Sequence, residues 1–416
     1  MPLIKPFTGL RPAPGRAAEV AAPPYDVLSA AEARVRADGK PWSFLHISKP
    51  EIDLPADTDP YAAEVYAKAA ENLQKMLDAD VLRRDAAPSF YAYRLTMPTV
   101  SGDHVQTGLV AAASVADYAT NRIRKHEFTR PDKEDDRVRQ IEALNAQTGP
   151  VLLAYPPSPS ADELLRQASA GHPAADVTAD DGIRHTIWVV SEPALIDKIS
   201  ATFDVMPALY IADGHHRSAA ASRVAAARRH DDADSDGEMS SDYFLAVIFP
   251  HHEMRIMDYN RVVRDLNGHS REGFLARLDE AFRVEAAADQ VRPSRPGEFG
   301  LYLKGQWFRL HINPALIPHD PVARLDVSLL SDHLLGPLLG IEDLRRDKRI
   351  DFVGGIRGLG ELQRRVDSGE MAVAFALYPT GMEDLMAVAD ANQVMPPKST
   401  WFEPKLADGL VSHVID

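Results

Sequence analysis

The chain has 416 residues, of which 46 are Lys or Arg and 61 are Asp or Glu, so its formal net charge is −15. This acidic balance argues against a broad nucleic-acid surface, which needs a basic face to displace counterions. The sequence contains no cysteine, which excludes disulfides, thiolate catalysis and Cys-based zinc sites. With 45% hydrophobic and 26% charged residues, the composition is typical of a packed globular core. The length suggests two or three domains, or one large domain with additions.

The N-terminal residues indicate where the protein works. Residues 1–16, MPLIKPFTGLRPAPGR, contain no apolar core of signal-peptide length. The sequence also lacks a run of about 18 uninterrupted apolar residues that could span a membrane. We therefore expect a cytoplasmic protein with no membrane and no nucleic-acid partner.

The first half of the chain predicts a mixture of helices and strands. Residues 61–78 carry apolar side chains at helical spacing, which predicts an amphipathic helix. The runs 90–97 and 105–115 flank Ser101-Gly102-Asp103 and predict a hairpin. The charged stretch 132–148 predicts another helix. Buried strands are predicted from the apolar runs at 150–155, 185–190, 208–212 and 244–250.

The second half predicts a separate region. Pro293, Pro296 and Gly297 punctuate the polar stretch 286–299, so we place a domain boundary there, between a main domain of residues 1–285 and a C-terminal region of residues 286–416. A hairpin with Gly305-Gln306 as its turn follows. Helices are predicted at 322–339 and 358–369, and a strand at 371–377.

The segment Asp213 to Arg217 is the sharpest candidate site. It follows the apolar run 208–212 and precedes an Ala-rich stretch, 218–229, that predicts a helix, so the segment indicates a strand, a tight turn and a helix. Gly214 lets the backbone approach a ligand closely, and the first N–H groups of a helix favour an anion. Arg217 adds a planar fork of donors that suits phosphate oxygens. In the alternative reading, Asp213 only caps the helix and the two histidines are surface residues.

Other clusters have polar groups that could join such a site. His126-Glu127 stands in a basic neighbourhood and could perform general acid/base catalysis, although a solvated loop is an equal alternative. Lys398, Ser399, Thr400 and Lys405 could grip an anion, although this segment could instead be held only by its aromatic residues.

These motifs together resemble a known family. The chain resembles the bacterial and archaeal family called domain of unknown function 1015, over nearly its whole length. The resemblance is carried by residues 6–12 (PFTGLRP), 23–27 (PPYDV), 50–53 (PEID), 126–127 (HE), 135–137 (DDR), 212–217 (ADGHHR), 325–327 (LDV), 395–400 (MPPKST) and 404–405 (PK).

The Gly-His-His-Arg segment is similar to the phosphate-binding box of the ParB/sulfiredoxin superfamily, which includes a free-serine kinase. The resemblance implies an α/β fold with mixed sheets, in which a ParB/sulfiredoxin-like core carries large N- and C-terminal additions. Sulfiredoxin has Cys where this chain has His215, so its thiol chemistry is excluded. ParB partitioning needs a DNA-binding module, which the acidic balance does not support.

We therefore expect a kinase-type, nucleotide-dependent phosphotransferase that acts on a small hydroxylated metabolite such as serine or a related hydroxy acid. Glu127, with His126, is the first choice of base, and Glu51 is the second. Mg²⁺ would bridge phosphate oxygens, with Asp213 or Asp26 as its ligand. The phosphates of ATP or ADP would be held by Asp213, Gly214, His215, His216, Arg217 and Ser218. The substrate would be held by Tyr25, Asp26, Arg137, Lys398, Ser399, Thr400 and Lys405.

Two alternatives remain at this stage. The same residues could belong to a hydrolase that cleaves a phosphate ester or a nucleotide with water, or to a nucleotide-binding regulator without turnover. The sequence leaves the donor, the acceptor and a homodimeric state open.

Overall fold

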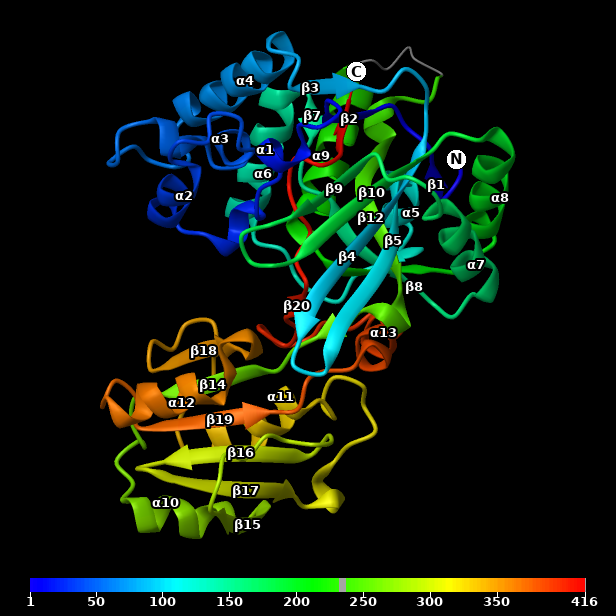
Figure 1. Ribbon diagram of the computed structural model, residues 1–416. Coiled ribbons are helices and arrows are strands. Elements are labelled where there is room, and N and C mark those ends of the chain that lie inside the picture. Colours follow the sequence, from blue (N-terminus) through cyan, green and yellow to red (C-terminus); the bar gives the residue numbers. More distant parts are fainter. Residues whose placement is uncertain (232–236, 416) are drawn as a thin grey trace. The chain divides into compact units, whose positions relative to one another are not determined.

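The structure is a computed structural model that describes residues 1–231 and 237–415, and it divides the chain into two compact units (Figure 1). Unit 1 consists of Met1–Met254 and Pro404–Asp416, and unit 2 consists of Arg255–Glu403. The stretch 286–299, where the sequence suggests a boundary, lies inside unit 2. It joins two strands, β15 (Phe282–Ala287) and β16 (Glu298–Leu303), which both pair with β17 (Gln306–Ile312).

A mixed sheet forms the centre of unit 1. Its pairs are antiparallel except that β12 runs parallel to β8 and β11 runs parallel to β6. The strands are, in spatial order, β6 (Ile123–Arg124), β11 (Leu209–Asp213), β8 (Val151–Tyr155), β12 (Tyr243–Pro250), β5 (Gly102–Ser114), β4 (Phe90–Thr99), β10 (Arg184–Val190) and β9 (Ala175–Thr178), and β1 (Ile4–Lys5) pairs with β5.

Helices pack on this sheet and on one another. The helices predicted at 61–78, 132–148 and 218–229 are confirmed as α4, α6 and α9, and the predicted hairpin is confirmed as β4 and β5. Apolar residues from α7, α8 and α9 join alternate residues of the strands in the main core. The helices are α1 (Ala17–Val20), η1 (Tyr25–Val27), α2 (Ala30–Ala37), α3 (Leu45–Ser48), η2 (Pro50–Asp53), α4 (Ala63–Asp78), α5 (Val115–Ala119), α6 (Pro131–Leu144), α7 (Pro159–Ala168), α8 (Pro193–Asp204), α9 (His215–Asp231), η3 (Ser240–Asp242) and η4 (His251–Glu253).

The last residues of the chain return to unit 1. Strand β21 (Ser412–Val414) lies between β2 (Gly9–Pro12) and β7 (Ala146–Gln147) in a small sheet that β3 (Leu82–Arg84) completes. Ile415 packs with Ile141 of α6 and with Val224 of α9. Residues 404–415 are therefore built into unit 1, although 149 residues of unit 2 separate them from its other part.

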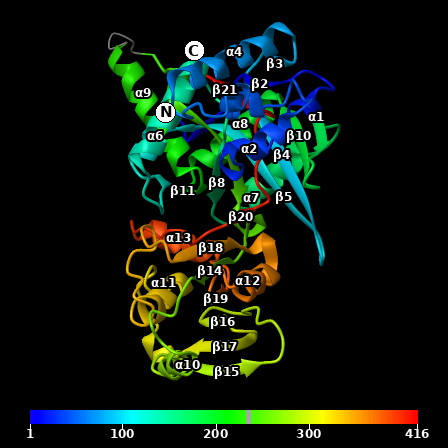
Figure 2. The same cartoon turned by 90° about the vertical axis from the view of Figure 1, so that its left-hand side faces the viewer.

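Unit 2 is built on an antiparallel sheet, whose strands follow one another in Figure 2. Its order is β15, β17, β16, β19 (Val373–Leu377), β14 (Tyr259–Val263) and β18 (Ile350–Gly354), and a further pair joins β13 (Arg255–Ile256) to β20 (Phe402–Glu403). The helices are α10 (Arg271–Leu278), η5 (Pro314–Leu316), α11 (Asp326–Leu330), η6 (Ser331–Leu335), η7 (Gly355–Arg357), α12 (Gly358–Asp367) and α13 (Met382–Asp390).

Two predictions for unit 2 need correction. The turn between β16 and β17 is Lys304-Gly305, one residue earlier than predicted, and both residues have positive φ, 48° and 80°. Such a turn matches the twist of the flanking strands. The helix predicted over 322–339 is short, because α11 ends at Leu330 and continues as the wider turn η6.

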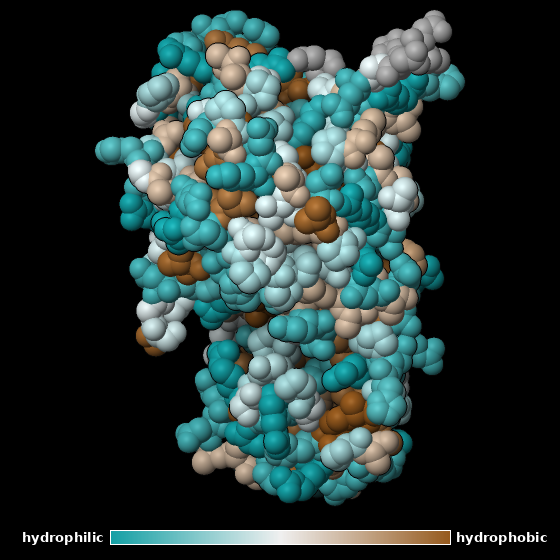
Figure 3. Space-filling model, turned by 90° about the vertical axis from the view of Figure 1, so that its right-hand side faces the viewer, coloured by the Kyte–Doolittle hydropathy of each residue, from teal (hydrophilic) through white to brown (hydrophobic). Residues whose placement is uncertain are grey.

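The fold is therefore mixed α/β. One face of the molecule shows mostly hydrophilic residues, with hydrophobic ones in small groups (Figure 3). Among the residues described, no helix combines the length and the apolar character that crossing a bilayer requires.

Candidate functional site

The predicted strand, turn and helix at Asp213 to Arg217 are present in unit 1. Strand β11 ends at Asp213, Gly214 turns the chain with φ +95°, and α9 begins at His215. The Gly214 carbonyl accepts hydrogen bonds from Arg217 N and Ser218 N at 2.9 and 3.1 Å. The N–H groups of His215 and His216 precede these first intrahelical bonds, so they lie where a helix attracts an anion.

A second segment meets this turn because β6 and β11 are parallel neighbours. Leu209 pairs with Ile123, and Tyr210 pairs with Arg124. Parallel strands end at the same edge of a sheet, where open α/β sheets hold ligands. The loop after β6 carries His126 and Glu127, and it therefore reaches the start of α9.

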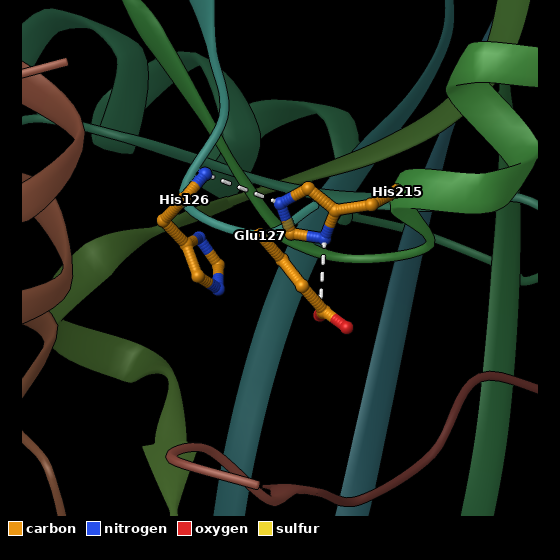
Figure 4. Close-up of side chains that lie close together, drawn as sticks. All are labelled: His126, Glu127 and His215. Carbon is orange, nitrogen blue, oxygen red and sulfur yellow. Dashed lines mark hydrogen bonds and ion pairs between the residues drawn. The ribbon is translucent and has the colours of Figure 1, made fainter. Parts of the chain in front are cut away.

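His126, Glu127 and His215 form one cluster (Figure 4). The Nδ1 atom of His215 lies 3.7 Å from Glu127 Oε2, and its Nε2 lies 3.4 Å from the backbone N of His126, which donates to it. Because Nε2 accepts, a neutral His215 carries its proton on Nδ1 and directs it at the Glu127 carboxylate. Burial, followed by His126, lowers the pKa of His215 well below its ordinary value against the pull of Asp213.

This cluster also has the residue types of a metal site. One ligand atom from each of the three residues lies within 4.8 Å of the others, and His126 Nδ1 is buried with no hydrogen-bond partner in the part of the chain that the structure describes. A cation at His215 Nδ1 would displace the proton that faces Glu127. The remaining proton of His215 would then sit on Nε2, where it would face the backbone N–H of His126. Because two donors facing each other cannot form a hydrogen bond, this arrangement disfavours a metal.

The two carboxylates predicted as Mg²⁺ ligands lie near Arg217. Asp213 Oδ1 accepts from Gly214 N at 2.8 Å, and Oδ2 lies 3.1 Å from Lys405 Nζ. Burial would raise the pKa of Asp213, but Lys405 and Arg217 hold it far below its ordinary value. Asp26 is more exposed and lies 3.8 Å from Arg217 Nη2.

Arg217 connects this turn to a small cavity in unit 1. Its Nη1 donates to the Pro150 carbonyl, and its Nε lies 3.1 Å from the position that a Cβ on Gly214 would occupy. Tyr25, Arg137 and Asp408 line the cavity with Arg217. Burial alone would lower the pKa of Arg217, but Asp26, Asp213 and Tyr25 raise it above its ordinary value.

The structure brings several of the predicted residues together. Tyr25, Arg137 and Arg217 share the cavity, Asp26 and Lys405 each contact the turn segment, and Glu127 contacts His215. Ser218 is buried and donates to the His215 carbonyl at 3.0 Å, and His216 Nε2 accepts from Arg130 N at 3.1 Å.

Other predicted residues have partners elsewhere. Glu51 is buried, and Oε1 lies 3.0 Å from Lys49 Nζ. Lys398, Ser399 and Thr400 belong to unit 2, where the Lys398 carbonyl accepts from Arg261 and the Ser399 hydroxyl donates to the Pro396 carbonyl at 2.6 Å.

Two residues of the cavity were missed at the sequence level. Asp408 is only 2% exposed, and burial raises its pKa to about 7 against the opposing effect of Arg217. Gly149 lies beside it, because a Cβ there would be 3.3 Å from Arg217 Cδ and 3.8 Å from Asp408 Oδ1. The Asp-Gly pair at 408–409 was the signal available for Asp408, and nothing local pointed to Gly149.

The family model described as Protein of unknown function (DUF1015) matches residues 4–328. The chain belongs to the DUF1015 family. This confirms the expected resemblance to the DUF1015 family over residues 4–328. No curated protein matches this DUF1015 protein in sequence.

Several solved structures are similar to this DUF1015 protein at low identity. A free serine kinase in complex with AMP is 13% identical, with a TM-score of 0.35, over 70% of this chain and 86% of that chain. A conserved hypothetical protein from Pyrococcus furiosus is 14% identical, with a TM-score of 0.33, over 72% and 93%. SbnI with a C-terminal truncation, from Staphylococcus aureus, is 12% identical, with a TM-score of 0.35, over 71% and 84%.

Proposed function

We propose that this chain is a cytoplasmic, nucleotide-dependent phosphotransferase that acts on a small hydroxylated metabolite, with serine or a related hydroxy acid as the first candidates. The observation that carries the proposal is the contact between His215 and Glu127, at 3.7 Å. It places a carboxylate beside a helix N-terminus that also carries Arg217. In this proposal, the helix N-terminus and Arg217 form a phosphate cradle, and Glu127 beside them supplies the base.

The phosphate cradle would consist of backbone and side-chain donors. The N–H groups of His215 and His216 and the guanidinium of Arg217 would hold the phosphates of ATP or ADP. Fixed donors of this kind replace water around the charge that moves during phosphoryl transfer. The raised pKa of Arg217 keeps this group charged throughout the physiological range.

Glu127 would act as the base. Its side chain is 52% exposed, so a substrate hydroxyl can reach it, while His215 Nδ1 lies 3.7 Å from the carboxylate. The hydroxyl would give its proton to Glu127 as its oxygen bonds to the terminal phosphorus. The bond from that phosphorus to the bridging oxygen would break, and the shortened nucleotide would leave with the electron pair.

Mg²⁺ fits this site through Asp26 better than through Asp213. Both oxygens of Asp213 already have donors, whereas the Asp26 carboxylate is 42% exposed. Mg²⁺ takes one or two protein carboxylates and completes its shell with phosphate oxygens and water. When bound, it would neutralise charge on the phosphates.

The test uses ATP and ADP labelled in the terminal phosphate, with Mg²⁺ and a panel of amino acids and hydroxy acids. We expect labelled product from the wild type and a fall in kcat of about 100-fold or more in Glu127→Gln. Nucleotide affinity should stay unchanged in that variant, and Arg217→Ala should lose it. Glu142→Gln, an exposed change on α6, serves as the control.

Other outcomes would replace the proposal. Phosphate release that needs no acceptor would identify a hydrolase. Tight nucleotide binding without any turnover would identify a regulator. Activity of Glu127→Gln equal to that of the wild type would remove Glu127 as the base.

A further inference from the structure

The cavity beside α9 brings together polar and charged groups from four separate segments of unit 1. Tyr25 comes from η1, Arg137 from α6, Arg217 from α9 and Asp408 from the C-terminal segment. Its volume is about 30 Å³. Burying two arginines at one small cavity costs free energy, because each guanidinium loses water. This cost is offset only where an anionic group pairs with the charge.

Both arginines keep donors that the protein does not use. Arg137 donates to Asp136 through Nε at 3.0 Å and Nη2 at 2.6 Å, and its guanidinium lies 4.0 Å from the centre of the Tyr25 ring. Arg217 donates through Nη1 to the Pro150 carbonyl. A guanidinium has five N–H groups. Within residues 1–231 and 237–415, Arg137 Nη1 and Arg217 Nε have no hydrogen-bond acceptor.

The size of the cavity limits what can bind there. A volume of about 30 Å³ accommodates roughly two water-sized atoms. That is enough for the two oxygens of a carboxylate or for part of a phosphate, and too little for a nucleobase or a ribose. The planar forks of two arginines suit such an oxyanion, because each can offer parallel N–H donors.

The acidic groups around the cavity neutralise only part of its positive charge, because Asp213, which also faces Arg217, pairs with Lys405. Asp136 pairs with Arg137, and Asp26 lies at the longer distance of 3.8 Å from Arg217. Asp408 faces Arg217, Asp26, Arg137 and the backbone of Tyr25. Burial raises the pKa of Asp408 to about 7, so near neutral pH this carboxyl is protonated in a large part of the molecules.

We propose that this cavity is an oxyanion subsite, in which Arg137 and Arg217 together bind one carboxylate or phosphate group of a ligand. A carboxylate would belong to the acceptor, and a phosphate would belong to the nucleotide or to the product. The subsite requires only binding, so it does not depend on the phosphotransferase proposal.

The first test measures thermal shifts of the full chain at pH 7. Potassium acetate and potassium sulfate are compared with potassium chloride at equal ionic strength, because neither anion titrates near this pH. We expect a saturable rise in Tm from at least one of the two, relative to chloride. A larger effect of acetate would assign the subsite to a carboxylate, and a larger effect of sulfate would assign it to a phosphate.

Matched variants show whether the anion-dependent rise in Tm comes from binding at this cavity. Arg137→Lys keeps a cation beside Asp136 but removes the fork, and we expect roughly tenfold weaker binding. Arg139→Lys is the control, because Arg139 is exposed on the same helix. Each variant is compared with its own melting curve in chloride, so a general loss of stability does not count as a loss of binding.

Gly149→Ala tests the cavity without removing a charge. The added methyl group would lie 3.3 Å from Arg217 Cδ and 3.9 Å from its Nη1, so it narrows the cavity with little disturbance of the fold. Gly360→Ala is the matched control, because the added methyl group would have no other described part of the chain within 4 Å beyond its own helix turn. We expect weaker anion binding only in Gly149→Ala.

The outcome is decisive in either direction. The subsite is ruled out if acetate and sulfate act like chloride, or if Arg137→Lys and Gly149→Ala bind as the wild type does. If the anion shifts appear but no labelled phosphate is transferred, the phosphotransferase proposal fails and the subsite stands.

Discussion

Arg217 in unit 1 is mostly buried and Arg261 in unit 2 is fully buried, and the two arginines have opposite surroundings. Arg217 in unit 1 lies among Asp26, Asp213 and Asp408, which raise its pKa although burial opposes them. Arg261 in unit 2 is fully buried over the rings of Tyr259 and Phe352.

Backbone carbonyls, rather than carboxylates, hold Arg261. It donates to the carbonyls of Tyr259 and Lys398, the second at 3.0 Å, and no carboxylate in the described parts of the chain forms an ion pair with it. Burial lowers the pKa of Arg261 to about 10. An arginine that lines a cavity and keeps unused N–H donors can bind an anionic ligand. An arginine among carbonyls ties backbone segments together, here β14 and residues 395–400.

The largest expected effect separates these two roles. Arg217→Met should weaken the binding of acetate or sulfate roughly 100-fold, because it removes a charged fork from the cavity. Arg261→Met should leave that binding unchanged and lower the free energy of unfolding by about 2 kcal/mol, because two carbonyls lose their donor. Thermal shifts and urea unfolding measure both quantities. Loss of anion binding in both variants would contradict the assignment of a binding role to Arg217 and a structural role to Arg261.

The response to acid should also differ between the units. In unit 1, burial lowers the pKa of His185 to about 4. Its Nδ1 accepts from the Tyr93 hydroxyl at 2.7 Å, and that hydroxyl accepts from Ala407 N at 3.0 Å. Because the pKa of His185 is lower in the folded state, neutral His185 stabilises the fold fully above about pH 6.5. This contribution to the free energy of unfolding is lost as the pH falls toward 4.

The loss from His185 should be on the order of 3 kcal/mol. His185→Gln keeps an acceptor for Tyr93 but does not titrate, so its stability should depend less on pH between 7 and 4. Urea unfolding at several pH values measures this. Equal pH dependence in the wild type and the variant would exclude His185 as the cause.

Unit 2 should show an effect of opposite sign. Burial raises the pKa of Asp326 to about 7 although Gly297 N donates to it at 2.8 Å. Since the folded-state pKa is raised, the contribution of Asp326 is complete below about pH 4 and is lost as the pH rises through 7. Hydrogen exchange in β16 and β17 should therefore quicken from pH 5 to 8, after correction for the intrinsic rate. Asp326→Asn should remove this change.

The elements that could be predicted from the sequence are those whose signal is local. Apolar spacing over 61–78 predicts α4, and two strand-like runs around Gly102 predict the β4–β5 hairpin. The predicted turn was one residue too late. Lysine rarely adopts positive φ, so the sequence did not indicate Lys304 as a turn residue. The unit boundary at Met254 has no Pro/Gly cluster, so composition alone does not reveal it.

The site could be predicted only in part for the same reason. Asp213 to Arg217 has a local pattern of strand, turn and helix, and the sequence locates it directly. That His126 and Glu127 reach this turn follows from the parallel pairing of β6 with β11, which no local pattern encodes. Asp408 enters through a segment that lies almost 200 residues after Arg217, so its place in the cavity depends on the tertiary fold.

Unit 1 consists of two chain segments with unit 2 between them, and this order affects how the protein folds during synthesis. Lys405, Asp408 and β21 leave the ribosome only after all of unit 2. Domains generally fold as units during synthesis, beginning at the N-terminus. Unit 1 cannot do so completely, because until residues 404–415 have been made it lacks Asp408 in its cavity and Lys405 beside Asp213. A nascent chain stopped at residue 403 should therefore carry a folded unit 2 and an unfinished ligand site.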